Sequence, residues 1–172
     1  MEFNSKKVLI IGNNGSGKSY FSTKLSEITG LPLVHLDKLY WRENWSHPTR
    51  DEWIKTQENL LKQDEFIIDG MYISTLEMRF SQAEAIIFLD IDLQTCIEAI
   101  KGREGIKRVD FPEYLEQNQK KFEELLIGAY EFDEKRKPRI LELKNKYQSK
   151  VFIVLNTREE ADRYLEEISM KI

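Results

Sequence analysis

Residues 7–19 read KVLIIGNNGSGKS, and this stretch decides the fold. Its first part, Lys7–Ile11, is a short apolar run that leads into glycine, as expected for a strand buried on both faces of a sheet. The second part, Gly12–Ser19, matches the pattern Gly-x-x-x-x-Gly-Lys-Ser/Thr in every fixed position. Apolar residues at helical spacing follow it. The stretch therefore predicts a strand, a glycine-rich turn and a helix in succession.

The glycine-rich turn has the chemistry of a phosphate-binding loop. Its glycines let backbone N–H groups converge on phosphate oxygens, and the helix that follows adds the partial positive charge of its N-terminus. Lys18 is expected to reach the β- and γ-phosphates of a nucleotide, and the Ser19 hydroxyl suits a magnesium ligand. The residues expected to bind the nucleotide are Gly12, Asn13, Asn14, Gly15, Ser16, Gly17, Lys18, Ser19 and Tyr20.

Strand-like runs alternate with helical patterns along the rest of the chain. This alternation predicts a three-layer α/β fold, with a parallel sheet that has helices on both faces. Pro138 should break a long helical segment near Lys137. The further strands are expected at Leu33–Leu36, Phe66–Ile68, Ala85–Leu89 and Val151–Leu155. Helices are expected from the loop to Gly30, at Trp53–Leu61, at Leu93–Lys101, over most of Tyr114–Tyr147, and around Ala161, Leu165 and Ile168.

The composition is that of one ordinary globular domain. Of the 172 residues, 41% are hydrophobic and 33% are charged, so the chain can bury one core and keep a polar surface. Its 26 basic and 30 acidic side chains give a net charge of −4, which disfavours contact with nucleic acid. The single cysteine, Cys96, excludes an internal disulfide and is expected in the core. No apolar stretch approaches the ~20 residues that span a bilayer, and we expect a cytoplasmic protein.

A phosphate-binding loop alone does not separate kinases from GTPases, ATPases or nucleotide-sensing regulators. The chain lacks the Asn-Lys-x-Asp motif that reads guanine, which disfavours a typical small GTPase. Asp69 and Asp90 each come at the end of an apolar strand, at the edge where an open parallel sheet binds its ligands. Either carboxylate could therefore bind magnesium. Gly70 permits close backbone approach beside Asp69, whereas Asp90 precedes a helix that it would cap. We favour Asp69, with Ser19, as the metal ligands.

A set of short motifs is spread along the chain. They are Gly12–Ser19, His35–Asp37, Trp41–Trp45, Ile67–Gly70, Thr75–Leu76 with Arg79, and Ile87–Asp90. Together they resemble the DNA topology modulation protein family, which is similar to adenylate kinases and other small-molecule P-loop kinases. The resemblance covers most of the chain, and its His-Leu-Asp and Asp-Gly-x-Tyr segments are more specific than the phosphate-binding loop. The family's name records a genetic association and does not establish contact with DNA.

The resemblance implies a nucleoside-monophosphate-kinase-like core with strand order 2-3-1-4-5. It also implies a single domain with an acceptor region at about residues 37–65 and a lid at about residues 103–114. Arg103 is similar to the arginine at which the lid of adenylate kinases begins. Cations are expected there because phosphoryl transfer needs positive charge around the transferring group. The expected lid cations are Arg103, Lys107, Arg108 and Arg136, and Arg139 is a further one.

The acceptor region combines an acidic residue with aromatic ones. Asp37 would orient or deprotonate a substrate hydroxyl, although capping the next segment would also explain it. Trp41 and Tyr72 are expected to contact the acceptor, but such rings also close small cores. Arg79 would screen a phosphate on the acceptor from Asp37. His35 lies within a strand, which predicts a buried, hydrogen-bonded role.

These patterns favour an ATP-dependent phosphotransferase, with magnesium, that acts on a nucleotide or another small-molecule acceptor. The alternative is an ATP-binding regulatory protein linked to DNA topology, without kinase chemistry. We expect no direct nucleic-acid partner and no membrane partner. The residues expected to be catalytic are Lys18, Asp37, Asp69 and Arg103.

Overall fold

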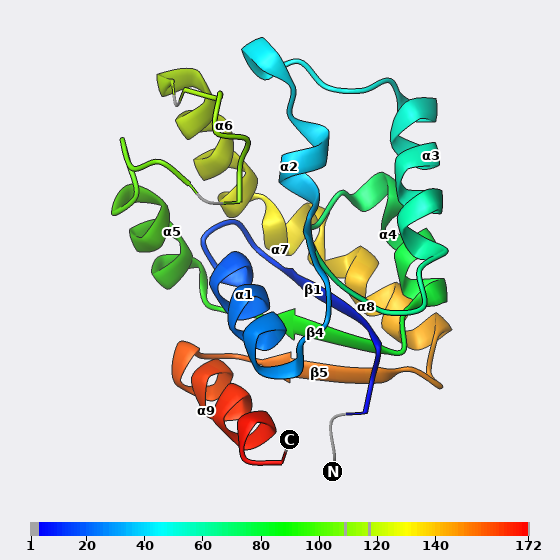
Figure 1. Cartoon of the computed structure of the whole chain (residues 1–172). Coiled ribbons are helices and arrows are strands. Elements are labelled where there is room, and N and C mark those ends of the chain that lie inside the picture. Colours follow the sequence, from blue (N-terminus) through cyan, green and yellow to red (C-terminus); the bar gives the residue numbers. More distant parts are fainter. Residues whose placement is uncertain (1–3, 109, 117, 172) are drawn as a thin grey trace.

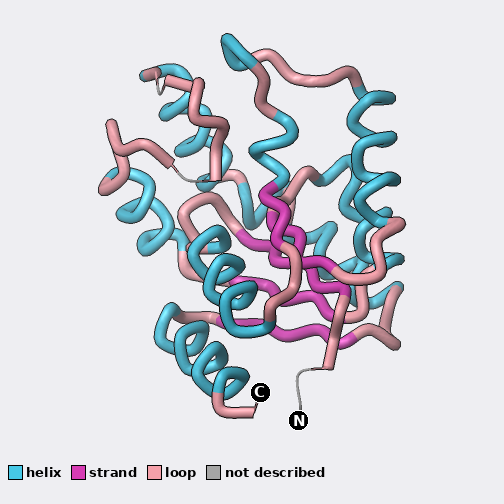
Figure 2. Tube along the Cα trace, viewed as in Figure 1, coloured by secondary structure: helices cyan, strands magenta, loops and turns pink. Residues whose placement is uncertain are grey.

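Five parallel strands form the central sheet in the order β2-β3-β1-β4-β5, which confirms the predicted order (Figure 1 and Figure 2). The computed structural model describes residues 4–108, 110–116 and 118–171, so Val109, within the expected lid, lies outside the described residues. The strands are β1 (Lys7–Gly12), β2 (Leu33–His35), β3 (Phe66–Asp69), β4 (Ala85–Leu89) and β5 (Val151–Leu155).

Helices cover both faces of the sheet, as the alternating pattern predicts. In the described ranges none of them is long and apolar enough to cross a membrane. They are α1 (Lys18–Thr29), α2 (Leu36–Tyr40), α3 (Arg50–Leu61), α4 (Ile73–Gln82), α5 (Leu93–Lys101), α6 (Gln119–Tyr130), α7 (Phe132–Lys135), α8 (Lys137–Lys146) and α9 (Arg158–Ser169), and a 3-10 turn, η1, spans Glu43–Trp45.

The two faces of β1 belong to two separate layers of the core, because successive side chains of a strand point to opposite faces. Val8 and Ile10 pack with apolar residues of α1 and α9. Leu9 and Ile11 pack with those of α3, α4, α7 and α8. Cys96 is fully buried in the first of these layers, as predicted. The sheet is thereby fixed from both sides, with the loop after β1 at its carboxyl edge.

Several helices differ from the sequence expectations. Helix α3 begins at Arg50 rather than Trp53, and α4 was not expected. Leu36, expected in a strand, begins α2, and its side chain is fully buried in the core. The helix expected from Tyr114 begins only at Gln119, because the Asn118 side chain accepts a hydrogen bond from the Lys121 N–H and caps it. The break at Pro138 is confirmed: α8 starts beside it, in a first turn where proline's missing N–H costs nothing.

Candidate functional site

A cleft of about 1350 Å³ lies at the carboxyl edge of the sheet. Pockets for one small molecule usually hold roughly 300–1,000 Å³, so the cleft has room for two ligands. The turn at Gly12–Tyr20, which we call the phosphate loop, bounds one part of the cleft, the loop half. Residues 14–20 line it, whereas Gly12 and Asn13, which were also expected to bind the nucleotide, do not. The other part, the aromatic half, is bounded by Asp37, Trp41, Trp45, Tyr72 and Phe111.

The phosphate loop is shaped by its glycines and by its own polar groups. Gly15 and Gly17 have φ angles of +79° and +93°, a backbone conformation that favours glycine. The Lys18 ammonium donates a 2.7 Å hydrogen bond to the Asn13 carbonyl oxygen. Burial lowers the pKa of Lys18, although the Asp69 and Asp37 carboxylates oppose that shift. Lys18 therefore lies at the cleft with its cation held inside the loop.

Two asparagines tie the phosphate loop to α6. Asn13 Nδ2 donates to the Ala129 carbonyl oxygen at 3.0 Å, and Asn14 Nδ2 donates to the Leu125 carbonyl oxygen at 3.1 Å. A Cβ at Gly128 would lie 3.0 Å from Asn14 Nδ2, so the missing side chain lets the helix approach the loop. The loop and α6 are therefore positioned together.

Gly15→Ala is expected to lower the free energy of unfolding by more than about 2 kcal/mol, since a Cβ there would overlap the Cys96 carbonyl oxygen. Gly17→Ala is the matched control, because its φ is also positive but a Cβ would meet nothing within 4 Å. Its cost should be about 1 kcal/mol, from backbone strain alone. Denaturant unfolding of both variants measures the difference, and equal costs would contradict this account of the loop.

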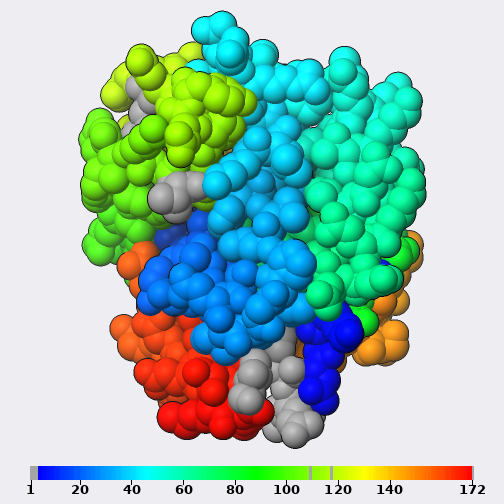
Figure 3. Space-filling view, in the orientation of Figure 1, coloured from blue at the N-terminus to red at the C-terminus, as the bar shows by residue number. Residues whose placement is uncertain are grey.

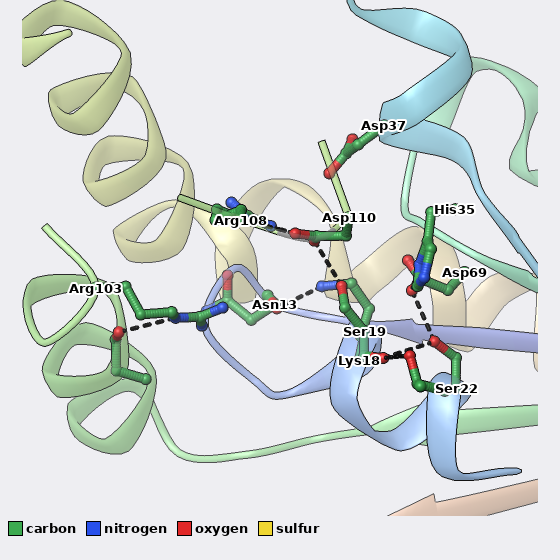
Figure 4. Close-up of polar contacts among 12 residues, drawn as sticks. Asn13, Lys18, Ser19, Ser22, His35, Asp37, Asp69, Arg103, Arg108 and Asp110 are labelled. Carbon is green, nitrogen blue, oxygen red and sulfur yellow. Dashed lines mark hydrogen bonds and ion pairs between the residues drawn. The ribbon is translucent and has the colours of Figure 1, made fainter. Parts of the chain in front are cut away.

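Asp69, rather than Asp90, lines the cleft. Its Oδ2 accepts a 2.8 Å hydrogen bond from Ser22 Oγ on α1 and lies 2.7 Å from His35 Nδ1 (Figure 4). His35 is hydrogen-bonded as predicted, but it is partly rather than fully buried. Asp90 forms a 2.8 Å ion pair with Lys137 outside the cleft. A carboxylate and the Ser19 hydroxyl are hard oxygen donors of the kind that magnesium accepts, together with phosphate oxygens. The donor set at Ser19 and Asp69 therefore fits a nucleotide-borne magnesium ion.

A third acidic residue, Asp110, reaches the phosphate loop from the expected lid. Its Oδ2 accepts a 2.6 Å hydrogen bond from Ser19 Oγ, and both its oxygens pair with the Arg108 guanidinium (Figure 4). Burial alone would raise the pKa of Asp110, but Arg108 and Ser19 hold it at about 2. The sequence analysis did not identify Asp110, because the only sequence feature that points to it is its position in a basic loop.

The expected cations divide between the cleft and the surface. Arg103, Lys107 and Arg136 line the cleft together with Arg108. Arg139 does not line it, because its guanidinium pairs with Glu77 and Glu142 elsewhere. Arg158, which the sequence analysis missed, also lines the cleft and donates to the Gly15 carbonyl oxygen at 3.4 Å.

Asp37 and Tyr72 meet in the aromatic half. The Tyr72 hydroxyl donates a 2.5 Å hydrogen bond to Asp37 Oδ1. Burial raises the pKa of Asp37 in spite of this bond, and burial next to the Asp37 carboxylate raises the pKa of Tyr72. The Tyr40 ring packs on Tyr72 at 4.7 Å and edge-on against Trp41 at 5.0 Å. The structure thus brings together Asp37, Trp41 and Tyr72 as the sequence predicted.

The structure does not bring Arg79 into this group. Its side chain is 1% exposed, does not line the cleft, and donates hydrogen bonds to the carbonyl oxygens of Gly70, Met71 and Tyr72. Tyr72 has a φ of 29°, which is strained for a residue with a side chain. Arg79 therefore holds the strained turn that presents the Tyr72 hydroxyl to Asp37.

The acceptor region, cyan in Figure 3, lies against the yellow-green segment that leads into α6. Trp45 Nε1 donates to the Glu116 carbonyl oxygen at 2.9 Å, and the Tyr114 hydroxyl donates to the Trp41 carbonyl oxygen at 3.0 Å. The Lys121 ammonium lies 4.7 Å from the Trp41 ring centroid. These contacts, which we call the roof, join two segments that are distant in sequence.

The strand order, the phosphate loop between β1 and α1, and the position of the cleft together define the P-loop kinase fold. Solved structures of three kinases share it. A gluconokinase from Sinorhizobium meliloti 1021 is similar with a TM-score of 0.54 and 17% identity, over 99% of this chain and 96% of that chain. A deoxyadenosine kinase from M. mycoides with bound dATP has a TM-score of 0.51 and 18% identity, over 95% and 97%.

A shikimate kinase from Bacteroides thetaiotaomicron has a TM-score of 0.56 and 12% identity, over 96% of this chain and 97% of that chain. At these identities the likeness establishes the fold. The sequence matches no protein-family model and no curated protein at a significant level.

Proposed function

We propose that the chain is an ATP-dependent phosphotransferase that transfers the γ-phosphoryl group to a small-molecule acceptor. The observation that carries this proposal is the continuity of one cleft from the phosphate loop to Asp37 and the aromatic side chains. A protein that only sensed ATP would not require the second half. The P-loop kinase fold and the sequence resemblance to the DNA topology modulation family support the same class.

In the proposed site the phosphate loop binds the ATP phosphates, and Lys18 supplies a cation to them. The buried Ser16 Oγ has no hydrogen-bond partner in the described part of the chain, as expected for a group that serves a phosphate. Ser19 and Asp69 would hold magnesium, which neutralises phosphate charge when bound. Arg103, with Lys107 and Arg108, would supply further positive charge from a lid at about residues 103–114, and Arg136 would add to it from the turn between α7 and α8.

The proposal also assigns the acceptor to the region at about residues 37–65 together with Tyr72. Asp37 lies where an acceptor group would approach the phosphate loop, and Trp41 offers an aromatic surface. One domain then contains both sites.

Acceptor-dependent ADP formation tests the proposed function. The purified chain, with ATP and magnesium, is assayed against nucleosides, nucleoside monophosphates, sugars and sugar acids. We expect at least one acceptor to raise ADP formation in a saturable manner. ATP binding, measured separately by calorimetry, without acceptor-dependent ADP formation would favour the regulatory alternative. Binding of duplex DNA that weakens steeply with salt would point the same way.

A further inference from the structure

Arg79, which the sequence analysis expected to screen a phosphate on the acceptor, instead binds carbonyl oxygens inside the protein. Arg79 donates to three successive carbonyl oxygens, at 3.0 Å for Gly70, 2.6 Å for Met71 and 3.0 Å for Tyr72. Because the side chain is also 1% exposed, moving it to a ligand would leave these three carbonyls without their donor. Arg79 therefore cannot neutralise a phosphate in the aromatic half.

The two cations that do face the aromatic half are paired with carboxylates. Arg108 binds Asp110 through two hydrogen bonds, and its guanidinium lies 4.2 Å from the Phe111 ring centroid. Lys121 lies above Trp41 and forms a 2.6 Å ion pair with Glu124. Each cation is therefore already bound to a carboxylate of its own segment.

The other cations of the described cleft belong to the loop half. Arg158 reaches the Gly15 carbonyl oxygen, and Lys107 lines a smaller hollow beside Tyr20 and Arg103. Arg136 lies near Gly128 and Asn14, where α6 meets the phosphate loop. Positive charge is thus concentrated around the expected ATP phosphates. These cations are Lys18, Arg103, Lys107, Arg136 and Arg158.

Asp37 places a carboxylate in the aromatic half that forms no ion pair in the described chain, while Arg108 and Lys18 act on it electrostatically from the side of the phosphate loop. Its Oδ1 accepts the Tyr72 hydroxyl, so its Oδ2 is the oxygen that a ligand would meet. A phosphate group next to this carboxylate would be repelled, because like charges placed together cost several kcal/mol unless a cation screens them. A hydroxyl group would instead donate a hydrogen bond to it.

The remaining walls are flat or apolar. The rings of Trp41, Trp45 and Phe111 line the aromatic half, and Trp45 and Phe111 pack with their centroids 5.7 Å apart. Met71 and Ile73 complete the lining beside Tyr72. Such surfaces favour a ligand with a ring, or another compact group, that carries little charge.

We propose that the acceptor is an unphosphorylated, uncharged hydroxyl compound with a ring, and that Asp37 accepts the proton of its hydroxyl. The proposal rests on the proposed phosphotransferase function. The acceptor oxygen forms a bond to the γ-phosphorus while the bond from that phosphorus to the β,γ-bridging oxygen breaks. ADP leaves with the electron pair of that bond. The hydroxyl proton passes to Asp37 and then to solvent.

Matched acceptor pairs test this proposal. Each nucleoside is compared with its 5′-monophosphate, and each hexose with its 6-phosphate, by kcat/KM for ADP formation. We expect the unphosphorylated member of the active pair to exceed its phosphorylated partner by more than about tenfold, because the phosphate both replaces the accepting hydroxyl and is repelled by Asp37. Activity with phosphorylated members alone would overturn the proposal and leave the proposed function standing. The absence of stimulation by every compound would overturn both.

Asp37→Asn tests the proton-accepting role with the active acceptor. We expect kcat to fall by about 100-fold or more, while ATP affinity measured by calorimetry stays within about twofold. In the parent, kcat should fall as the pH decreases through the raised pKa of Asp37, because the protonated carboxyl cannot accept a proton. Tyr72→Phe keeps the ring and removes only the hydroxyl that donates a hydrogen bond to Asp37. Since that bond lowers the pKa of Asp37, the pH at which kcat declines should shift upward.

Asp64→Asn, which removes an exposed carboxylate far from the cleft lining, is the matched control and should leave kcat unchanged. Circular dichroism confirms that each variant is folded. Parental kcat and an unchanged pH profile in folded Asp37→Asn would overturn the assignment of the proton to Asp37.

Discussion

A folded Lys18→Ala variant is expected to lose acceptor-dependent ADP formation by about 100-fold or more, since removing one preorganised group that stabilises transition-state charge costs about 3 kcal/mol. The Lys18 side chain lines the cleft, and its one described hydrogen bond goes to the Asn13 carbonyl oxygen of its own loop. The fold does not depend on this bond, so the midpoint of thermal unfolding should change little.

Lys24→Ala is the control for Lys18→Ala. Lys24 lies on the same helix, α1, but it is exposed and pairs with Glu27 at 2.8 Å. Its removal should leave ADP formation at the parental rate. Near-parental ADP formation by the folded Lys18→Ala variant would contradict the role of the phosphate loop in transfer.

Asp69→Asn should produce the second large loss of turnover. The substitution removes a negative charge from the cleft and alters the contacts with Ser22 and His35. If this carboxylate organises magnesium, turnover should recover partly as the magnesium concentration rises. Calorimetric titration of ADP at several magnesium concentrations should show a weaker dependence on the metal in the variant, which provides a measurement independent of turnover.

Asp90→Asn provides the comparison for Asp69→Asn, because Asp90 also follows a strand but pairs with Lys137 outside the cleft. It should lower stability slightly and leave turnover near the parental value. The reverse pattern would transfer the magnesium role to Asp90. Small and equal effects of both substitutions would instead favour a protein that binds nucleotide without transferring phosphate.

The strands and the phosphate loop could be predicted because their signals are local. Ala85–Leu89 and Val151–Leu155 are short apolar runs, and the structure gives both the predicted bounds. The glycines of the phosphate loop specify their own backbone conformation. The strand order came from the family resemblance, and the structure confirms it.

Helix α4 was not predicted, since two of its inward-facing residues are polar. Thr75 and Arg79 are buried beside Leu76 and Phe80, so the apolar pattern that reveals a helix is interrupted. An arginine in a helix usually indicates a solvated face. The three carbonyl oxygens that bind Arg79 are brought together only by the strained turn at Tyr72.

Asp110 could not be predicted for a different reason. It lies in the segment between α5 and α6, and its contact with Ser19 joins residues 91 positions apart in the sequence. A local sequence pattern cannot predict a contact between residues so far apart in the chain. The same holds for the roof, in which Trp45 and Tyr114 each bond to a backbone oxygen of the opposite segment.

The roof has a consequence for the order of events in turnover. Trp45 and Tyr114 each donate a hydrogen bond to a backbone oxygen of the opposite segment, so the two segments can separate only after both hydrogen bonds have broken. The segment that carries Tyr114 also carries Asp110, which is bonded to Ser19 in the loop half. If the chain transfers phosphate as proposed, an opening of this segment would break the contacts of both halves together, and the rate of that opening would set an upper limit on kcat.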